Sequence, residues 1–148
     1  LIPKRRATAR ALGAAAALDP TDDGWKQHLA GVVGSPAVDV AVDAVGTPDA
    51  FELAVAGVGP AGTVVAIGGW RPVPLDLDRL MHLELEVKGT FGFISKEFDE
   101  SLRWLEERRF DVDQVITDVL PLSQGPTVFA DLVAGRRPET IKSVLIPD

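Results

Sequence analysis

The stretch Val38–Gly69, VDVAVDAVGTPDAFELAVAGVGPAGTVVAIGG, decides the fold of this chain of 148 residues. Its two ends, Val38–Val45 and Thr63–Ile67, are runs rich in β-branched residues that stop at glycines, which is typical of buried parallel strands. Between them, Thr47 and Pro48 predict a helix start, because threonine caps helices and proline suits the first helical position. The stretch therefore predicts a strand, a covering helix and a second strand joined by a right-handed crossover.

Glycines follow both of these expected strands. Gly46 ends the first strand, and Gly68 and Gly69 end the second. In an open parallel sheet, ligands bind beyond the carboxyl ends of the strands. We therefore expect any binding function to lie at these two glycine turns.

The composition of the chain excludes several kinds of site. The absence of cysteine rules out disulfides, cysteine-ligated metals and a thiol nucleophile within this chain, and it fits a reducing compartment, for which we expect the cytoplasm. A net charge of −7 argues against nucleic acid as a partner. The apolar runs fall short of the roughly 18–20 residues that span a membrane, so no membrane partner is expected.

Basic residues gather at the start of the chain. Lys4, Arg5, Arg6 and Arg10 occur there without an acidic residue among them. Three interpretations stay open at this point: the solvated face of a helix, a set of phosphate contacts, or part of a targeting segment.

The rest of the chain alternates between helical and strand patterns. We expect helices over Pro3–Leu12, Asp22–Val33, Leu77–Met81, a segment capped by Ser95, and Phe129–Val133; and strands over Ala14–Leu18, Leu85–Phe93, Val115–Leu120 and Ile141–Ile146. This alternation predicts an α/β fold with a mainly parallel sheet and flanking helices. The pattern G-x-G-x-x-G occurs at Gly57, Gly59 and Gly62, but no long helix is expected after it, so we do not interpret it as the fingerprint of a complete dinucleotide-binding fold.

A series of short motifs, in order along the chain, carries a family resemblance. They are Arg5-Arg6, Ala11-Leu12-Gly13-Ala14, Asp19-Pro20, Asp39-Val40, Asp43-Ala44-Val45-Gly46, Gly62-Thr63-Val64-Val65, Lys88-Gly89-Thr90, Phe98, Val115-Ile116-Thr117, Pro121-Leu122 and Lys142-Ser143-Val144-Leu145. With these motifs the chain resembles the C-terminal half of the medium-chain zinc-dependent alcohol dehydrogenases, in particular butanediol, sorbitol and threonine dehydrogenases.

The resemblance implies an incomplete Rossmann-type fold. Residues 1–94 correspond to part of the nucleotide-binding domain, and residues 95–148 to a C-terminal α+β segment that packs on the catalytic domain in the family. The catalytic domain and the first two Rossmann strands have no counterpart here. Those two strands would lie between Ala14–Leu18 and Val38–Val45, so we expect a sheet that lacks its centre unless a separate chain or a rearrangement fills it.

The resemblance also implies a partial site for NAD or NADP. It assigns Arg5 to the adenosine ribose, Gly46 to the adenine and ribose, and Ile67, Gly68 and Gly69 to the nicotinamide ribose. Thr90, Phe91 and Gly92 correspond to the main chain that holds the nicotinamide carboxamide. Lys142 corresponds to a cation that reaches the pyrophosphate. A turn glycine or a solvated lysine explains these residues equally well from the sequence alone.

The catalytic groups of the family are not expected in this chain. The zinc ligands belong to the absent domain, and neither His28 nor His82 has a second ligand at zinc spacing, so we assign no catalytic or metal residue. The favoured function is the cofactor-binding part of an NAD(P)-dependent alcohol or polyol dehydrogenase, with a homodimer formed through the strand Leu85–Phe93. The alternatives are the zinc-free quinone and enoyl reductases of the same superfamily and a non-catalytic remnant that serves as a dimerisation module.

Overall fold

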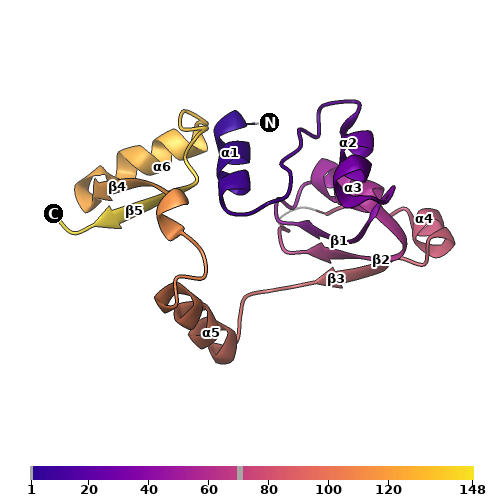
Figure 1. Cartoon of the computed structure of the whole chain (residues 1–148). Coiled ribbons are helices and arrows are strands. Elements are labelled where there is room, and N and C mark those ends of the chain that lie inside the picture. The colour runs from indigo at the N-terminus through magenta and orange to yellow at the C-terminus, as the bar shows by residue number, and fades with distance from the viewer. Residues whose placement is uncertain (1, 70–71) are drawn as a thin grey trace. The chain divides into compact units, whose positions relative to one another are not determined.

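The computed structural model describes residues 2–69 and 72–148, which form two units (Figure 1). One unit is Leu18–Phe93, and the other combines the residues up to Ala17 with Ile94–Asp148. Helix α1 (Pro3–Ala11) belongs to the same unit as the C-terminal residues.

The unit Leu18–Phe93 is built on a three-stranded sheet of order β1-β2-β3 in which both pairings are parallel. Along the chain its elements are α2 (Trp25–Val33), β1 (Val38–Asp43), α3 (Pro48–Gly57), β2 (Val58–Ala66), α4 (Leu77–His82) and β3 (Glu86–Gly89). Helices α2 and α3 lie on the same side of the sheet (Figure 1). The predicted strand–helix–strand arrangement of Val38–Gly69 is therefore confirmed.

Helix α3 begins as its sequence predicts. The Thr47 hydroxyl accepts a hydrogen bond from the Ala50 amide at 3.3 Å, and Pro48 occupies the first turn. The helix buries Phe51 and Val55 against the sheet, where Val64 of β2 is 0% exposed. Burial of these apolar side chains fixes which face of α3 meets the sheet.

The glycine- and proline-rich segment before Thr63 interrupts the pairing of β2 with β1. Val58 pairs with Val38, but the next register pair joins Val40 to Thr63. The intervening residues therefore bulge out of the ladder. A Cβ atom on Gly62 would collide with Val58 and would lie 2.9 Å from the carbonyl oxygen of Gly59, so the bulge requires a glycine there.

The second unit contains a two-stranded parallel sheet formed by β4 (Ile116–Pro121) and β5 (Lys142–Ile146). Helix α6 (Gly125–Val133) connects the two strands, and the short 3-10 helices η1 (Val112–Gln114) and η2 (Leu122–Gln124) flank β4. Helix α5 (Ser95–Glu106) completes this unit together with α1. Within the described residues, no helix has both the length and the apolarity needed to cross a lipid bilayer.

Three expected features differ in the structure. Residues Ala14–Leu18 are not a strand, because strand structure requires a hydrogen-bonded neighbour and the described sheets place none beside them. The strand expected over Leu85–Phe93 is limited to Glu86–Gly89, where it pairs with β2. Ser95 is not the cap of α5: it lies inside the helix, and the Glu97 carboxylate accepts from the amide of Ile94, the actual N-cap, at 2.9 Å.

Candidate functional site

The turn after β1 is organised by the side chain of Asp43. Its Oδ1 atom accepts hydrogen bonds from the amides of Val45 at 2.9 Å and Gly46 at 3.0 Å. Asp43 is 4% exposed and is the one charged residue classed as buried in the described part of the chain. Its carboxylate therefore satisfies two backbone donors that would otherwise lack partners beneath the turn.

The backbone of Asp43 joins this turn to the end of β2. Its carbonyl oxygen accepts from the amide of Ile67 at 2.9 Å and from that of Gly68 at 3.0 Å. One residue thus fixes both glycine turns at the carboxyl edge of the sheet. No role was predicted for Asp43, which belongs to the motif Asp43-Ala44-Val45-Gly46. An acidic residue three positions before a turn glycine is nevertheless a recognisable signal for side-chain to backbone hydrogen bonds.

The two turns approach each other so closely that they leave no room for side chains. Gly46 has φ +77°, and a Cβ atom on it would collide with the Gly69 amide nitrogen. A Cβ atom on Gly68 would lie 2.5 Å from the amide nitrogen of Gly46. The absence of Cβ atoms at these two glycines consequently allows the two turns to pack backbone against backbone.

The chain after β3 reaches the same edge. The Thr90 amide donates to the carbonyl oxygen of Ala66, the last residue of β2, at 3.0 Å. Phe91 is fully exposed, and Gly92 has φ +62°. The structure therefore places Thr90 at the carboxyl edge that also holds Gly46 and Gly68, and Phe91 and Gly92 continue from it.

Arg5 and Lys142, the two cations predicted for this site, belong to the other unit. There the Arg5 guanidinium donates to the carbonyl oxygen of Thr140 at 2.6 Å. Lys142 is the exposed first residue of β5, and among the described residues its ammonium group has no hydrogen-bond or ion-pair partner.

Asp118 of β4 is the centre of the hydrogen-bond network in this region. Its carboxylate accepts from Arg137, Thr140 and Ser143, each at 3.0 Å. Burial by itself would raise the pKa of Asp118, but the hydrogen bonds from Ser143 and Thr140 and the charge of Arg137, with a further contribution from Thr117, hold that pKa below its usual value of 3.8. No sequence pattern indicated this cluster, because its members come together only when β4 pairs with β5.

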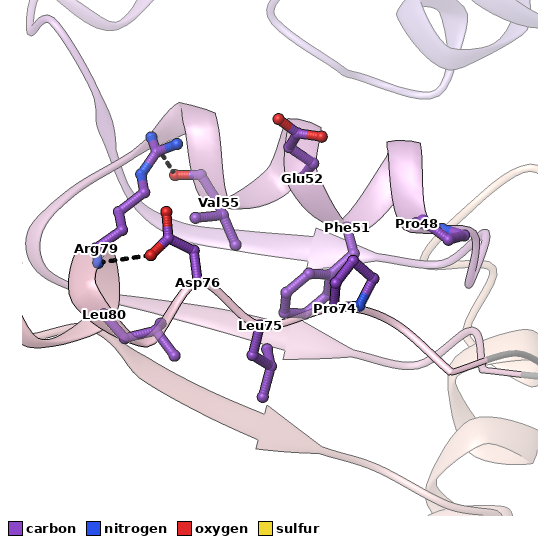
Figure 2. Close-up of a pocket in the computed structure, with 9 residues that line it drawn as sticks. All are labelled: Pro48, Phe51, Glu52, Val55, Pro74, Leu75, Asp76, Arg79 and Leu80. Carbon is purple, nitrogen blue, oxygen red and sulfur yellow. Dashed lines mark hydrogen bonds between the residues drawn. The ribbon is translucent and has the colours of Figure 1, made fainter.

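A hollow lies elsewhere, between α3 and residues 74–80 (Figure 2). It has a volume of about 340 Å³, and Phe51, Val55, Leu75 and Leu80 contribute apolar walls. The polar groups shown there are engaged in local structure: the Arg79 side chain donates to the Val55 carbonyl oxygen at 3.3 Å, and Asp76 caps α4 by accepting from the Arg79 amide at 3.1 Å. Glu52 points away from residues 74–80 (Figure 2). These groups form no catalytic constellation.

The histidines form local contacts. His28 Nδ1 lies 3.5 Å from the Asp22 carboxylate, and His82 Nδ1 lies 3.4 Å from that of Asp78. The part of the chain that the structure describes contains no group of three or more histidine, cysteine, aspartate or glutamate residues able to hold a metal ion. The candidate site is therefore the carboxyl edge of the β1-β2-β3 sheet, where the glycine turns lie. Arg5 and Lys142 belong to the other unit.

Comparison with known proteins identifies the family. Residues 1–107 match the family of zinc-binding dehydrogenases. The chain belongs to this family. The match includes all of the predicted site residues from Arg5 to Gly92, whereas Lys142 lies beyond it.

Several members of the zinc-binding dehydrogenase family resemble the chain over most of its length. A probable zinc-binding alcohol dehydrogenase of Mycobacterium tuberculosis is 30% identical over 112 residues, which make up 74% of this chain and 29% of that protein. The structure of 2R,3R-butanediol dehydrogenase from Bacillus subtilis has a TM-score of 0.83 at 25% identity and covers 100% of this chain and 42% of that one. Alcohol dehydrogenase from Thermus sp. ATN1 has the same fold, with a TM-score of 0.83 at 23% identity. The match covers 99% of this chain and 42% of that one.

These matches confirm the resemblance to the zinc-dependent alcohol dehydrogenases and the incomplete Rossmann-type fold that it implied. The chain spans 29% of the mycobacterial relative and 42% of each of the two solved structures, which is consistent with a C-terminal half.

The two acceptor functions of Asp43 predict graded effects of substitution. Asp43→Ala leaves the Val45 and Gly46 amides without their buried acceptor and should lower the free energy of unfolding by about 1–3 kcal/mol. Asp43→Asn keeps a side-chain oxygen that can accept from the same amides, so it should lower the free energy of unfolding clearly less than Asp43→Ala does. Urea unfolding followed by circular dichroism measures both, and equal losses in the two variants would contradict the proposed role of the acceptor.

The lowered pKa of Asp118 predicts a stability difference that depends on pH. Because the folded-state pKa lies below the unfolded-state value, the ionised carboxylate stabilises the fold at pH values above about 4, and this stabilisation is lost as pH falls through the lower folded-state pKa. Asp118→Asn should therefore be less stable than the wild type at pH 7, and the difference should shrink progressively below about pH 4. Thermal unfolding across this range tests the prediction, and a difference independent of pH would refute it.

Proposed function

We propose that the carboxyl edge of the β1-β2-β3 sheet binds a nicotinamide dinucleotide, as part of an NAD(P)-dependent zinc-type dehydrogenase that oxidises a secondary alcohol or polyol. The observation that carries this proposal is the backbone contact between the turns of Gly46 and Gly68. Two glycine turns without side chains, at the carboxyl ends of adjacent parallel strands, are suited to close contact with a nucleotide. Membership of the zinc-binding dehydrogenase family supports the choice of ligand.

Within this edge, the residues have distinct proposed roles. Gly46 contacts the adenine and its ribose, and Ile67, Gly68 and Gly69 contact the nicotinamide ribose. The main chain of Thr90–Gly92 offers amide donors and carbonyl acceptors for the nicotinamide carboxamide. For the other unit we propose separate roles: Arg5 for the adenosine ribose, and Lys142 for the pyrophosphate, since an ammonium group binds phosphate through charge-assisted hydrogen bonds.

The chain contributes binding and orientation to the reaction, and we assign it no catalytic residue. When bound, a nicotinamide cofactor would supply hydride chemistry, and a zinc ion held by a separate catalytic domain would supply Lewis-acid chemistry. The described histidines and carboxylates of this chain do not offer a zinc site. The zinc-binding alcohol dehydrogenase of M. tuberculosis and the butanediol dehydrogenase of B. subtilis support the zinc-dependent branch over the zinc-free reductases.

We also propose a homodimer formed through the strand expected over Leu85–Phe93. Its paired part, β3, has one neighbour in the described sheet, β2, and all four of its residues are exposed. Glu86 and Lys88 are the charged residues of this strand, and their opposite charges, which form an ion pair at 2.8 Å, leave it with no net charge. An exposed strand edge with little net charge can pair with the same strand of a second copy.

The dinucleotide proposal predicts saturable binding to the chain. Titration with NADH and NADPH, followed through the fluorescence of the three tryptophans, should show binding to the wild type. Gly68→Ala should weaken it about tenfold or more, because its Cβ atom would force the two turns apart at a cost of about 1–3 kcal/mol. Gly31→Ala is the matched control, since a Cβ atom on Gly31 meets nothing within 4 Å.

Two outcomes would count against the dinucleotide proposal. Absence of binding to a wild-type sample that is folded by circular dichroism would contradict it and would favour a non-catalytic dimerisation module. Equal affinity of the wild type and a folded Gly68→Ala variant would show that the two turns are not the site.

The dimer proposal predicts a specific effect of proline on β3. The Thr90 amide points toward β2, so by alternation along the strand the amides of Val87 and Gly89 point toward the free edge. Gly89→Pro removes one of these outward donors and should convert dimers to monomers in sedimentation velocity, while Gly89→Ala retains the donor and the dimer. A Cβ atom on Gly89 would meet nothing within 4 Å, so a clash of that atom does not account for a difference between the proline and alanine variants. Dimers that persist in the folded proline variant would argue for another interface.

A further inference from the structure

A hollow of about 270 Å³ lies beside α1, within the unit that combines this helix with the C-terminal residues. One wall is formed by Val115 and Ile141, the residues directly before β4 and β5. The opposite wall comes from α1 and its C-cap: Arg5, Thr8, Ala9 and Leu12. The hollow contains no residue of the two glycine turns, and all of its walls belong to a single unit.

The sequence of α1 explains why a hollow remains here. The four residues of its wall lie at positions i, i+3, i+4 and i+7, so they share one face of the helix. The two in the middle, Thr8 and Ala9, have small side chains, which leave space in front of Val115 and Ile141. No side chain of α1 is buried. Because protein interiors are normally close-packed, a space of this size beside a helix face is suited to a small ligand.

The charge of the lining selects the kind of ligand. Arg5 is the one charged residue among the described residues that line the hollow, and no acidic residue accompanies it. Its guanidinium group donates to the carbonyl oxygen of Thr140 at 2.6 Å, which fixes it next to Ile141. A guanidinium group has five N–H donors, so further donors are available for an anion. The Thr8 hydroxyl group, which has no hydrogen-bond partner among the described residues, is a second polar group at this wall.

We infer that this hollow binds a short-chain monocarboxylate, with its carboxylate at Arg5 and its hydrocarbon chain against Leu12, Val115 and Ile141. A planar guanidinium group matches a carboxylate through paired hydrogen bonds, and a single cation balances a single negative charge. The volume is below the roughly 300–1,000 Å³ of typical small-molecule sites, which limits the ligand to a short chain. This site goes beyond the proposed function and does not depend on it.

Titration of the full chain with hexanoate, followed by two-dimensional amide NMR spectra, tests the inference. Hexanoate should bind with a dissociation constant on the order of 1 mM, because so small a ligand offers few contact atoms. The amide signals of α1, Val115 and Ile141 should shift. Butanoate should bind about tenfold more weakly, because its shorter chain buries less apolar surface. Hexan-1-ol should also bind more weakly, since it lacks the charge that pairs with Arg5. Arg5 is also proposed for the adenosine ribose, so the titrations contain no dinucleotide.

Two variants separate the contribution of charge from that of space. Arg5→Gln removes the charge and should weaken hexanoate binding about tenfold. Ala9→Leu fills the hollow while leaving Arg5 in place, and it should abolish binding. Lys4→Gln is the matched control, because Lys4 is the neighbouring cation, pairs with Glu139 at 3.4 Å and does not line the hollow. It should leave the affinity for hexanoate unchanged.

Several results would overturn this inference. A folded wild type whose spectra do not change with hexanoate has no such site, and shifts confined to residues away from α1, Val115 and Ile141 would place binding elsewhere. Equal affinities of folded Arg5→Gln and the wild type would show that Arg5 does not bind the carboxylate. If Ala9→Leu does not fold, the comparison of butanoate with hexanoate decides whether the chain occupies the hollow, and equal affinities for the two would refute it. None of these results bears on dinucleotide binding at the glycine turns, which is tested separately with Gly68→Ala.

Discussion

The structure of the Leu18–Phe93 unit depends on one buried acid that serves two turns at once. The Asp43 carboxylate accepts from the backbone after β1, and the Asp43 carbonyl oxygen accepts from the backbone after β2. Because both turns are tied to the same residue, the separation between Gly46 and Gly68 is fixed by short hydrogen bonds. The absence of Cβ atoms at both glycines then becomes a requirement of the fold as well as an opportunity for a ligand.

Local signals in the sequence predicted the parts of this unit that local chemistry decides. Thr47 and Pro48 start α3 because a hydroxyl group and a fixed φ angle act on their own helix turn. Phe51 and Val55 are four residues apart, which places them on one face of this helix, and both are buried. Gly46 has a positive φ angle at the place where the sequence predicted the end of a strand. The order of these signals, together with the spacing of further motifs, was sufficient to identify the family.

Features that depend on distant partners could not be predicted in the same way. Ala14–Leu18 has the composition of a strand, but composition cannot supply the neighbouring strand that it requires. The Asp118 network combines residues of β4 with the segment before β5, and nothing in the sequence around Asp118 distinguishes it from a solvated acid. The partial hollow beside α3 likewise depends on how residues 74–80 cross that helix. In each case the deciding interaction joins segments whose spatial proximity is a result of folding.

Each of the two units commits one carboxylate to its own internal structure. In Leu18–Phe93, the candidate edge is formed by two glycine turns. The Asp43 carboxylate is buried there and accepts hydrogen bonds from the amides of Val45 and Gly46. In the other unit, the Asp118 carboxylate accepts from the side chains of Arg137, Thr140 and Ser143 and so ties β4 to the segment around the start of β5. In both units, therefore, a carboxylate joins segments that are distant in the sequence, through backbone amides and its own carbonyl group at Asp43 and through side chains at Asp118. These two of the acidic residues behind the net charge of −7 are accounted for by the structure that they hold together.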